Sequence, residues 1–161
     1  PALGGVYKLS AVVEDGKEIP KIKLSDNFAK ITNPGIKNVY RIYDEETGEA
    51  QADLIYLLSE GEYDDSRPLT ITHPTERWKQ TTFYHYKLRK LLVPVIEGGK
   101  RGYEMPSIRE IRDYAAREIA SLSDEHKRLD SPHIYKVDLS DKLYELKTSM
   151  IEEIRKGGEQ M

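Results

Sequence analysis

Short runs rich in Val, Ile, Leu and Tyr recur through about the first 100 residues and are separated by turn residues, a pattern typical of strands. Residues 6–13 and 19–24 are two such runs, joined by the Asp-Gly turn of EDGK, and they predict a hairpin. Residues 39–43 and 52–58 predict a second hairpin, with Gly48 as its turn residue. We therefore expect the N-terminal part to be antiparallel and rich in strands.

Three more strands are expected at residues 69–72, 81–88 and 91–96. In the second of them, Thr, Tyr or Leu occupies every other position, and this period of two is typical of a strand with one buried face. Gly98 and Gly99 follow the third run and predict a turn rather than a phosphate-binding loop.

A change of composition after Gly102 marks the start of a helical part. Ser107 and Glu110 have the spacing of a capping box, which predicts the start of a helix. The apolar positions of this helix share one face: Ile108, Ile111, Ala115, Ile119 and Leu122. A short second helix is expected from Ser123 to a stop before Pro132.

A third helix is expected near the C-terminus, with Gly157 as its stop signal. Its apolar stripe consists of Leu143, Leu146, Met150 and Ile154. The chain as a whole therefore predicts an α+β fold, in which an antiparallel β-rich N-terminal part precedes a C-terminal helical extension.

The balance of charge and the residue usage argue against several classes of function. The 161 residues carry a net charge of -3, and the aromatic residues are not interleaved with basic ones, which argues against nucleic-acid binding. The absence of cysteine excludes disulfides, thiolate metal sites and cysteine nucleophiles. No apolar run approaches the roughly 20 residues that span a bilayer, so we expect a cytoplasmic protein without a membrane partner.

The residues that usually carry catalysis or bind metals show no such pattern. The acid pairs at residues 64–65 and 152–153 are better explained by solvation than by acid-base catalysis. The histidines lack the spacing of metal ligands: His73, His85, His126 and His133. No catalytic or metal-binding residue is therefore predicted.

The lysine-rich stretch KIKLSDNFAKITNPGIK, residues 21–37, is the strongest candidate for a binding site. Its Asn-Pro-Gly sequence predicts a loop. Ammonium groups that converge on a di- or triphosphate form charge-assisted hydrogen bonds, each contributing roughly 1.5–3 kcal/mol. Lys23, Lys30 and Lys8 of the neighbouring predicted strand could converge in this way. The alternative is a solvated loop, because lysine is mostly exposed in proteins.

Three segments give the sequence a family resemblance: PALGGVYKL, PKIKLSDNFAKITNPGIKNVYRIYD and PSIREIRDYAAREIASLSDEHKRLDSPHIYKVDLSDKLYEL. From residue 1 to about residue 156 the chain resembles the C-terminal portion of long-form nicotinate phosphoribosyltransferases. The chain starts at Pro1 without an initiator methionine, and we expect it to be part of a longer enzyme.

The resemblance implies an enzyme that joins nicotinate to phosphoribosyl pyrophosphate, giving nicotinate mononucleotide and pyrophosphate, with ATP hydrolysis and Mg²⁺. It implies an active site in a partial α/β barrel that a dimer partner completes. The expected partners are therefore these substrates, the N-terminal catalytic portion and a second copy. In such an enzyme residues 1–14 would hold the last barrel strand, residues 15–102 a β-rich region on the flanking domain, and residues 103–161 the helical extension.

The same resemblance implies roles for five residues. Lys8, Lys23 and Lys30 would line a channel for the diphosphate of the donor or the ATP phosphates, Ser25 would hydrogen-bond a phosphate, and Gly5 would allow a close approach of the backbone. The family's base-stacking residues, phosphorylated histidine and ribose-phosphate loop have no counterpart here. We therefore expect the chain alone to bind no cofactor and turn over no substrate, and a non-catalytic dimerisation or assembly module is the alternative function.

Overall fold

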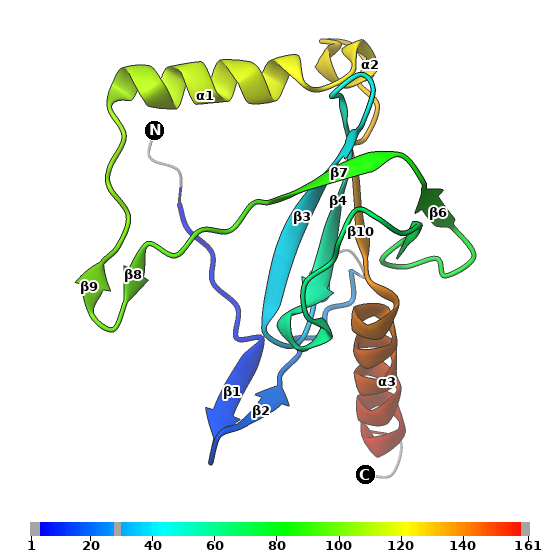
Figure 1. Ribbon diagram of the computed structural model, residues 1–161. Coiled ribbons are helices and arrows are strands. Elements are labelled where there is room, and N and C mark those ends of the chain that lie inside the picture. The colour runs from blue at the N-terminus through cyan, green and yellow to red at the C-terminus, as the bar shows by residue number, and fades with distance from the viewer. Residues whose placement is uncertain (1–3, 28–29, 159–161) are drawn as a thin grey trace.

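The computed structural model describes residues 4–27 and 30–158, which form one six-stranded sheet, two separate hairpins, three α-helices and a short 3-10 helix, η2 (Leu58–Glu60) (Figure 1). Within the sheet, β10 and β4 are parallel and the other neighbours are antiparallel. The strands lie in the spatial order β6 (Gln80–Phe83), β5 (Leu69–Thr72), β10 (Lys136–Leu139), β4 (Ala50–Leu57), β3 (Lys37–Asp44) and β7 (Tyr86–Lys90).

The predicted hairpin of β3 and β4 is confirmed, and the strand predicted at residues 69–72 is β5. Gly48 has a φ of 72° in the turn between β3 and β4, a conformation that glycine adopts at no steric cost. Tyr40 pairs with Leu54 and Ile42 pairs with Ala52 across the hairpin, so their side chains share one face of the sheet.

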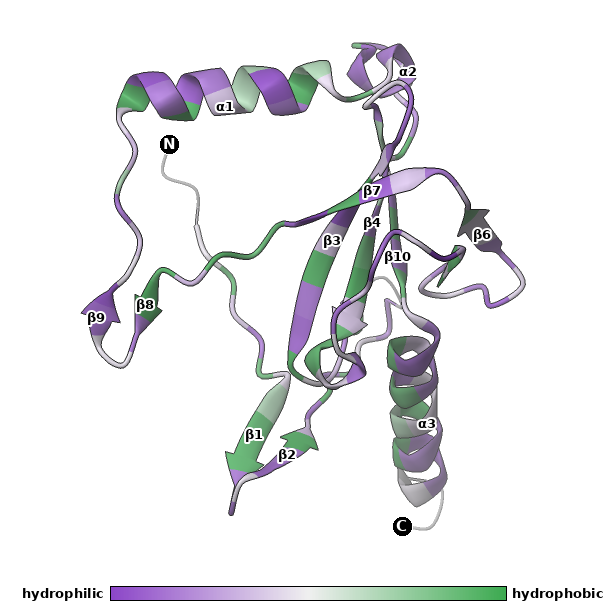
Figure 2. Cartoon of the chain, viewed as in Figure 1, coloured by the Kyte–Doolittle hydropathy of each residue, from purple (hydrophilic) through white to green (hydrophobic). Residues whose placement is uncertain are grey.

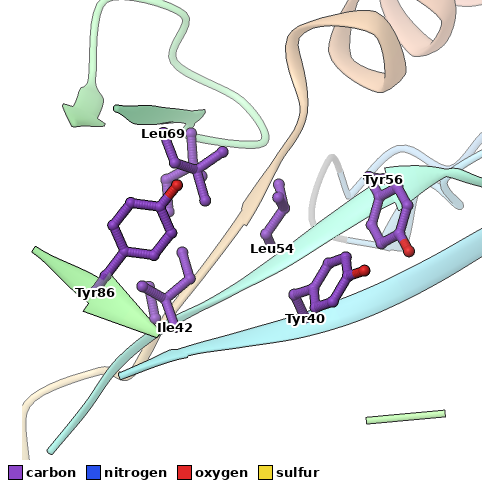
Figure 3. Close-up of a cluster of buried hydrophobic side chains, with 8 residues drawn as sticks. Tyr40, Ile42, Leu54, Tyr56, Leu69 and Tyr86 are labelled. Atoms are coloured by element: carbon purple, nitrogen blue, oxygen red, sulfur yellow. The ribbon is translucent and has the colours of Figure 1, made fainter. Parts of the chain in front are cut away.

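The main core lies on this face and also receives side chains from the outer strands. Figure 3 shows the Tyr86 ring of β7 between Leu69 and Ile42, and its hydroxyl donates to the carbonyl oxygen of Arg67 at 2.6 Å. The rings of Tyr40 and Tyr56 stack with their centroids 5.1 Å apart. The buried members of this core are Tyr40, Ile42, Ala52, Leu54, Tyr56, Leu69, Ile71 and Tyr86.

Strand β10 corrects two expectations, that the sheet is antiparallel and that the C-terminal part is helical throughout. It lies between β5 and β4, runs parallel to β4, and pairs Leu139 with Ile55. Its four residues lie between two helices, and their partner strands come from far earlier in the chain, so no local turn signal marks the pairing. The α+β class is confirmed, but the sheet is mixed.

The single strand predicted at residues 81–88 is wrong, because β6 and β7 lie at opposite edges of the sheet. The chain bends between them at Tyr84 and His85, and the N–H of Glu45 donates to the carbonyl oxygen of His85 at 3.3 Å. Tyr84 is 67% exposed, whereas Tyr86 is 2% exposed. Each strand keeps a period of two, so the alternation in the sequence does not reveal the break.

The predicted N-terminal hairpin is confirmed at its turn but is shorter than expected. It consists of β1 (Ala11–Glu14) and β2 (Lys17–Pro20). Asp15 and Gly16 join them with φ values of 50° and 74°, the positive values that a type I′ turn requires. Residues 6–10 form no strand, although the Ser10 carbonyl accepts the N–H of Lys21. Strand β2 ends at Pro20, because proline lacks the N–H that a longer ladder would need.

The strand predicted at residues 91–96 is also wrong, because only its last residue lies in a strand. β8 (Ile96–Glu97) and β9 (Lys100–Arg101) form a small hairpin that projects away from the main sheet in Figure 1. The predicted turn between them is confirmed, with positive φ at both Gly98 and Gly99.

The three predicted helices are confirmed as α1 (Ile108–Ala120), α2 (Asp124–Lys127) and α3 (Asp141–Gly158). The predicted capping box begins α1, since the N–H of Ser107 donates to the Glu110 carboxylate at 2.7 Å and the Ser107 hydroxyl accepts from the N–H of Glu110 at 3.3 Å. Helix α3 turns an apolar side toward the sheet in Figure 2, where Leu143 packs with Leu139 and Leu57.

Helix α1 lies across one end of the sheet, and its C-terminal end is the part nearest the strands (Figure 1). None of its side chains is buried, and Ile108 and Ile119 are 87% and 58% exposed. The predicted apolar face of α1 is therefore open to solvent. In the part of the chain that the structure describes, no helix has the length and apolar character needed to cross a membrane.

Candidate functional site

The lysine-rich loop, residues 21–36, leads from β2 to β3, and its two ends are held by the same carbonyl group. The backbone N–H groups of Lys21 and Gly35 donate to the carbonyl oxygen of Ser10 at 2.8 and 2.7 Å. The N–H of Ile36 donates to Oε1 of Glu18 at 2.6 Å. Both ends of the loop are therefore fixed to the β1–β2 hairpin and the residue before it.

Gly35 forms a buried corner at the end of this loop. Its φ is 84°, and a Cβ at this position would lie 2.5 Å from Cδ2 of Leu57. A side chain there would be strained by the backbone conformation and would also overlap β4. The Asn-Pro-Gly sequence that predicts a loop therefore also brings the loop into contact with the main sheet.

Helix α3 supports the loop from the other side through a buried lysine. Lys147 is 5% exposed, and its Nζ donates to Oδ1 of Asn33 at 2.9 Å. Burial lowers the pKa of Lys147. The sequence did not predict this contact because the two residues are 114 positions apart and neither belongs to a motif.

In the middle of the loop, one pair of residues holds the backbone, and the side chain of Ile31 is buried. The N–H of Lys23 donates to the Thr32 hydroxyl at 2.8 Å, and the N–H of Thr32 donates to the Lys23 carbonyl at 3.3 Å. The N–H of Lys30 donates to the carbonyl of Asn27 at 2.9 Å. The backbone at Lys23 and Lys30 is therefore held, while both side chains are exposed.

The three lysines proposed for phosphate binding are all exposed. Within residues 4–27 and 30–158, no hydrogen bond or ion pair involves the ammonium group of Lys8, Lys23 or Lys30. Lys8 lies on the extended segment before β1 rather than on a strand. The structure gives no contact among the three ammonium groups, so their convergence on one ligand stays a prediction.

Ser25 and Gly5 have different surroundings. Ser25 accepts the N–H of Asn27 at 3.3 Å, which leaves its hydroxyl hydrogen to donate, and it lines a hollow of about 610 Å³ together with Arg155 of α3. A Cβ at Gly5 would lie 3.0 Å from the ring of Tyr7, a residue of the same segment. The sequence does not single out Arg155, because a basic residue in the last turn of a helix is expected from the helix dipole.

Two other basic residues near the loop have structural roles. The Nζ of Lys37 donates to the carbonyl of Pro34 at 3.3 Å and also contacts the Gly35 carbonyl. Arg41 on β3 makes a two-pronged contact with Asp53 on β4, at 2.8 and 3.0 Å, and reaches Glu118 of α1 at 3.1 Å. These groups are already paired and are not available to a ligand.

Metal-binding groups are not assembled in the described residues. In residues 4–27 and 30–158, no three acidic or histidine side chains lie together in a way that could hold a metal ion. His73 and His126 instead accept or share local hydrogen bonds, His73 Nδ1 with the N–H of Glu76 at 3.2 Å and His126 Nδ1 with the Ser123 hydroxyl at 2.7 Å. The site therefore offers cations and a hydroxyl, the groups that suit an anionic ligand.

Comparisons with known sequences place this chain near one family of enzymes. A family model described as the nicotinate phosphoribosyltransferase C-terminal domain matches residues 36–147. The chain is 37% identical over 158 residues to nicotinate phosphoribosyltransferase of Bacillus subtilis (strain 168), covering 96% of this chain and 31% of that protein. The match to the Homo sapiens enzyme is 33% identical over 150 residues and covers 93% of this chain and 27% of that protein.

A comparison with solved structures gives a similar result. The crystal structure of human nicotinic acid phosphoribosyltransferase superposes with a TM-score of 0.67 at 28% identity, covering 74% of this chain and 24% of that one. The chain thus spans about a quarter to a third of the length of the curated relatives above. The range that the family model matches begins after Lys8, Lys23 and Lys30.

Proposed function

The chain belongs to the nicotinate phosphoribosyltransferase family, and on this premise we propose that it acts as the C-terminal part of an enzyme of NAD salvage. The enzyme would make nicotinate mononucleotide and pyrophosphate from nicotinate and phosphoribosyl pyrophosphate, with ATP hydrolysis. The observation that carries this proposal is the match of the family's C-terminal domain to residues 36–147. Because the relatives are much longer, we assign the activity to the whole enzyme and expect the chain alone to be inactive.

Within this enzyme the lysine-rich loop would bind phosphates. Lys23 and Lys30, together with Lys8, would contact the diphosphate of the phosphoribosyl donor or the phosphates of ATP. Their ammonium groups are exposed and unpaired in the described chain, which leaves them free to form charge-assisted hydrogen bonds. The fixed ends of the loop support this role, since a loop that is already ordered loses less entropy on binding.

The remaining parts of the proposed site follow the same chemistry. Ser25 would donate its hydroxyl hydrogen to a phosphate oxygen, and Gly5 would allow the backbone to approach the ligand. Mg²⁺ is usually held by one or two carboxylates together with substrate phosphates. In the proposed enzyme the phosphates bound by this chain and the catalytic portion would therefore hold the metal ion.

An activity assay on two proteins tests the proposed function. The full-length enzyme that contains this chain is expected to form nicotinate mononucleotide and pyrophosphate from nicotinate, phosphoribosyl pyrophosphate and ATP, whereas the 161-residue chain is expected to form neither. An inactive full-length protein that is folded would contradict the assignment to this reaction. Product formation by the 161-residue chain would contradict the proposal that this chain needs the catalytic portion for activity.

A second function, an assembly module, is favoured by the apolar side of α1. Tyr103, Met105, Ile111 and Tyr114 line a hollow of about 560 Å³ between α1 and the segment before it. We propose that the catalytic portion of the enzyme covers this surface, since the relatives carry a long additional chain. The same proposal includes a homodimer, a cytoplasmic location, and a division of the chain into residues 1–14, 15–102 and 103–161.

A further inference from the structure

Another hollow, of about 430 Å³, opens beside β5, β6 and β10, and the lysine-rich loop contributes none of its lining. Its lining includes His73, Trp78, Thr81, Lys136 and Asp138. Lys136 and Asp138 are alternate residues of β10, so they project from the same face of the sheet. The topology therefore brings the acid and the base of β10 to the same place as the indole of Trp78, which belongs to a distant stretch of the chain.

Asp138 is the unusual member of this group. It is 3% exposed, and no hydrogen bond or ion pair of the described residues reaches its carboxylate. Burial raises its pKa, although the charges of Lys136 and His73 act in the opposite direction. A mostly buried carboxylate that receives no hydrogen bond from the chain is costly to keep in a folded protein. The Asp138 oxygens are not among the fully buried unpartnered atoms of the described residues, so they can accept a donor from a molecule in the hollow.

The neighbouring polar groups make their hydrogen bonds to other partners and none to this carboxylate, although each lysine ammonium keeps further donors for a ligand. The Lys136 ammonium donates to the Thr81 hydroxyl, and His73 Nδ1 accepts from the N–H of Glu76. Lys79 pairs with the Glu76 carboxylate at 2.5 Å. The carboxylate therefore lines the hollow with its acceptor capacity unused.

Trp78 provides a flat apolar surface at the same hollow. Trp78 is 76% exposed, and the Lys79 ammonium lies 4.8 Å from the centroid of its ring. An exposed indole is a good stacking surface for planar rings. The combination of a stacking surface and a buried acceptor is more selective than either feature alone.

We propose that this hollow binds a planar nitrogen heterocycle that carries an N–H or amino donor, the class to which the nucleobases belong. The ring stacks on Trp78, and its donor supplies the hydrogen bond that the Asp138 carboxylate lacks. A phosphate attached to the heterocycle would meet the ammonium groups of Lys79 and Lys136. The nucleoside and its nucleotide are therefore two sources of the same chemistry, and the experiment separates them.

Trp78 allows a direct test, because it is the single tryptophan of the chain. The 161-residue chain is titrated with adenosine, guanosine and cytidine and with their 5′-monophosphates while tryptophan fluorescence is recorded. We expect at least one nucleoside to give a saturable change, with a Kd at least tenfold weaker in Asp138→Leu. The matched control, Asp113→Leu on the exposed surface of α1, is expected to leave the Kd unchanged.

The phosphate is tested by Lys136→Met, which should remove any tighter binding of the monophosphate relative to its nucleoside. Asp138→Leu changes a mostly buried position, so a folding defect could also weaken binding in that variant. Trp78→Leu is therefore a second test, because the exposed Trp78 side chain contributes little to the core. In that variant the saturation-transfer NMR signals of the heterocycle, present with the unmodified chain, should disappear. The proposal is overturned if no probe gives a saturable fluorescence change, or if Asp138→Leu or Trp78→Leu binds as tightly as the unmodified chain.

Discussion

At the scale of single residues, the shape of the lysine-rich loop depends most on Gly35. Its φ is positive, and a Cβ added there would lie only 2.5 Å from Leu57 Cδ2, so the corner has no room for a side chain. Gly35→Ala is therefore expected to lower the free energy of unfolding by roughly 2 kcal/mol or more, measured by chemical denaturation.

Gly48→Ala is the matched control for this change. Gly48 also has a positive φ, 72°, but nothing lies within 4 Å of a Cβ at its position. It should lose only the conformational part, roughly 1 kcal/mol. Equal losses in the two variants would mean that the contact between the loop and β4 does not matter.

The stability contributed by Asp138 is expected to depend on pH in the opposite sense to that of a paired acid. Burial raises the pKa of Asp138 above 3.8, the ordinary value for an aspartate, so the folded protein binds the carboxyl proton more tightly than the unfolded chain does. The free energy of unfolding therefore falls as the pH rises from 3.8 through the folded-state pKa. The free energy of unfolding of Asp138→Asn should exceed that of the unmodified chain by roughly 1 kcal/mol at pH ~7. This difference should shrink as the pH is lowered, and chemical denaturation at several pH values measures it.

Structural features set by neighbouring residues could be predicted from the sequence, whereas contacts between residues far apart in the chain could not. The Ser107–Glu110 capping box and the turn glycines are set by neighbours within a few positions, and the structure contains them. The contact of Lys147 with Asn33 depends on the packing of α3 against the loop, which no local pattern encodes. For the same reason Arg155 did not enter the predicted site beside Ser25.

At the scale of elements, α1 is tied to the sheet by a cluster of charges at its C-terminal end. Glu118 contacts Arg41 and Arg89, and it is the Arg89 hydrogen bond first of all that holds the pKa of Glu118 below its usual value of 4.5. An acid with a lowered pKa stabilises the fold above its unfolded pKa, and this stabilisation is lost as the pH falls through the folded-state pKa.

Glu118→Gln should loosen α1 because it removes the charge that both arginines contact. We expect a loss of roughly 1 kcal/mol in the free energy of unfolding, since Arg89 is 42% exposed, together with faster hydrogen exchange along α1. Glu152→Gln on the exposed side of α3 is the control and should change neither quantity. Unchanged exchange in α1 would mean that other contacts hold this helix.

The elements themselves were predictable where a strand pairs with a neighbour close in the sequence. The β3–β4 hairpin follows from its own turn, whereas β10 pairs with β4 across a long separation and carries no turn signal. The split between β6 and β7 was missed because both strands alternate with the same period. The candidate lysines were proposed from the lysine-rich stretch and from the family resemblance, and their convergence on a ligand stays a prediction.

At the scale of the whole molecule, the distribution of apolar surface suits a part of a larger assembly. Val6 and Tyr7 before β1, Val93 near β8, and Ile108 on α1 are all more than half exposed. The well-packed core lies on one face of the sheet instead, with side chains from β3, β4, β5 and β7. We therefore expect these exposed residues to be covered in the full-length enzyme.

This expectation is tested by hydrogen exchange on α1 and the segment before β1. In the full-length enzyme both should exchange more slowly than in the 161-residue chain, because the catalytic portion covers them. The β3–β4 hairpin, which is buried in either case, serves as the internal control. Equal exchange rates in the two proteins would argue against the proposed docking surface.

The most direct test of phosphate binding by this chain is the steady-state kinetics of the full-length enzyme carrying Lys23→Glu and Lys30→Glu. We predict that KM for phosphoribosyl pyrophosphate or ATP rises at least tenfold, about 1.4 kcal/mol of binding, or that turnover is lost, while native mass spectrometry shows the unchanged assembly. Lys142→Glu, an equal change of charge at an exposed position of α3, should leave the kinetics as they are. Unaltered KM and kcat for both substrates in the double variant would contradict phosphate binding by the lysine-rich loop.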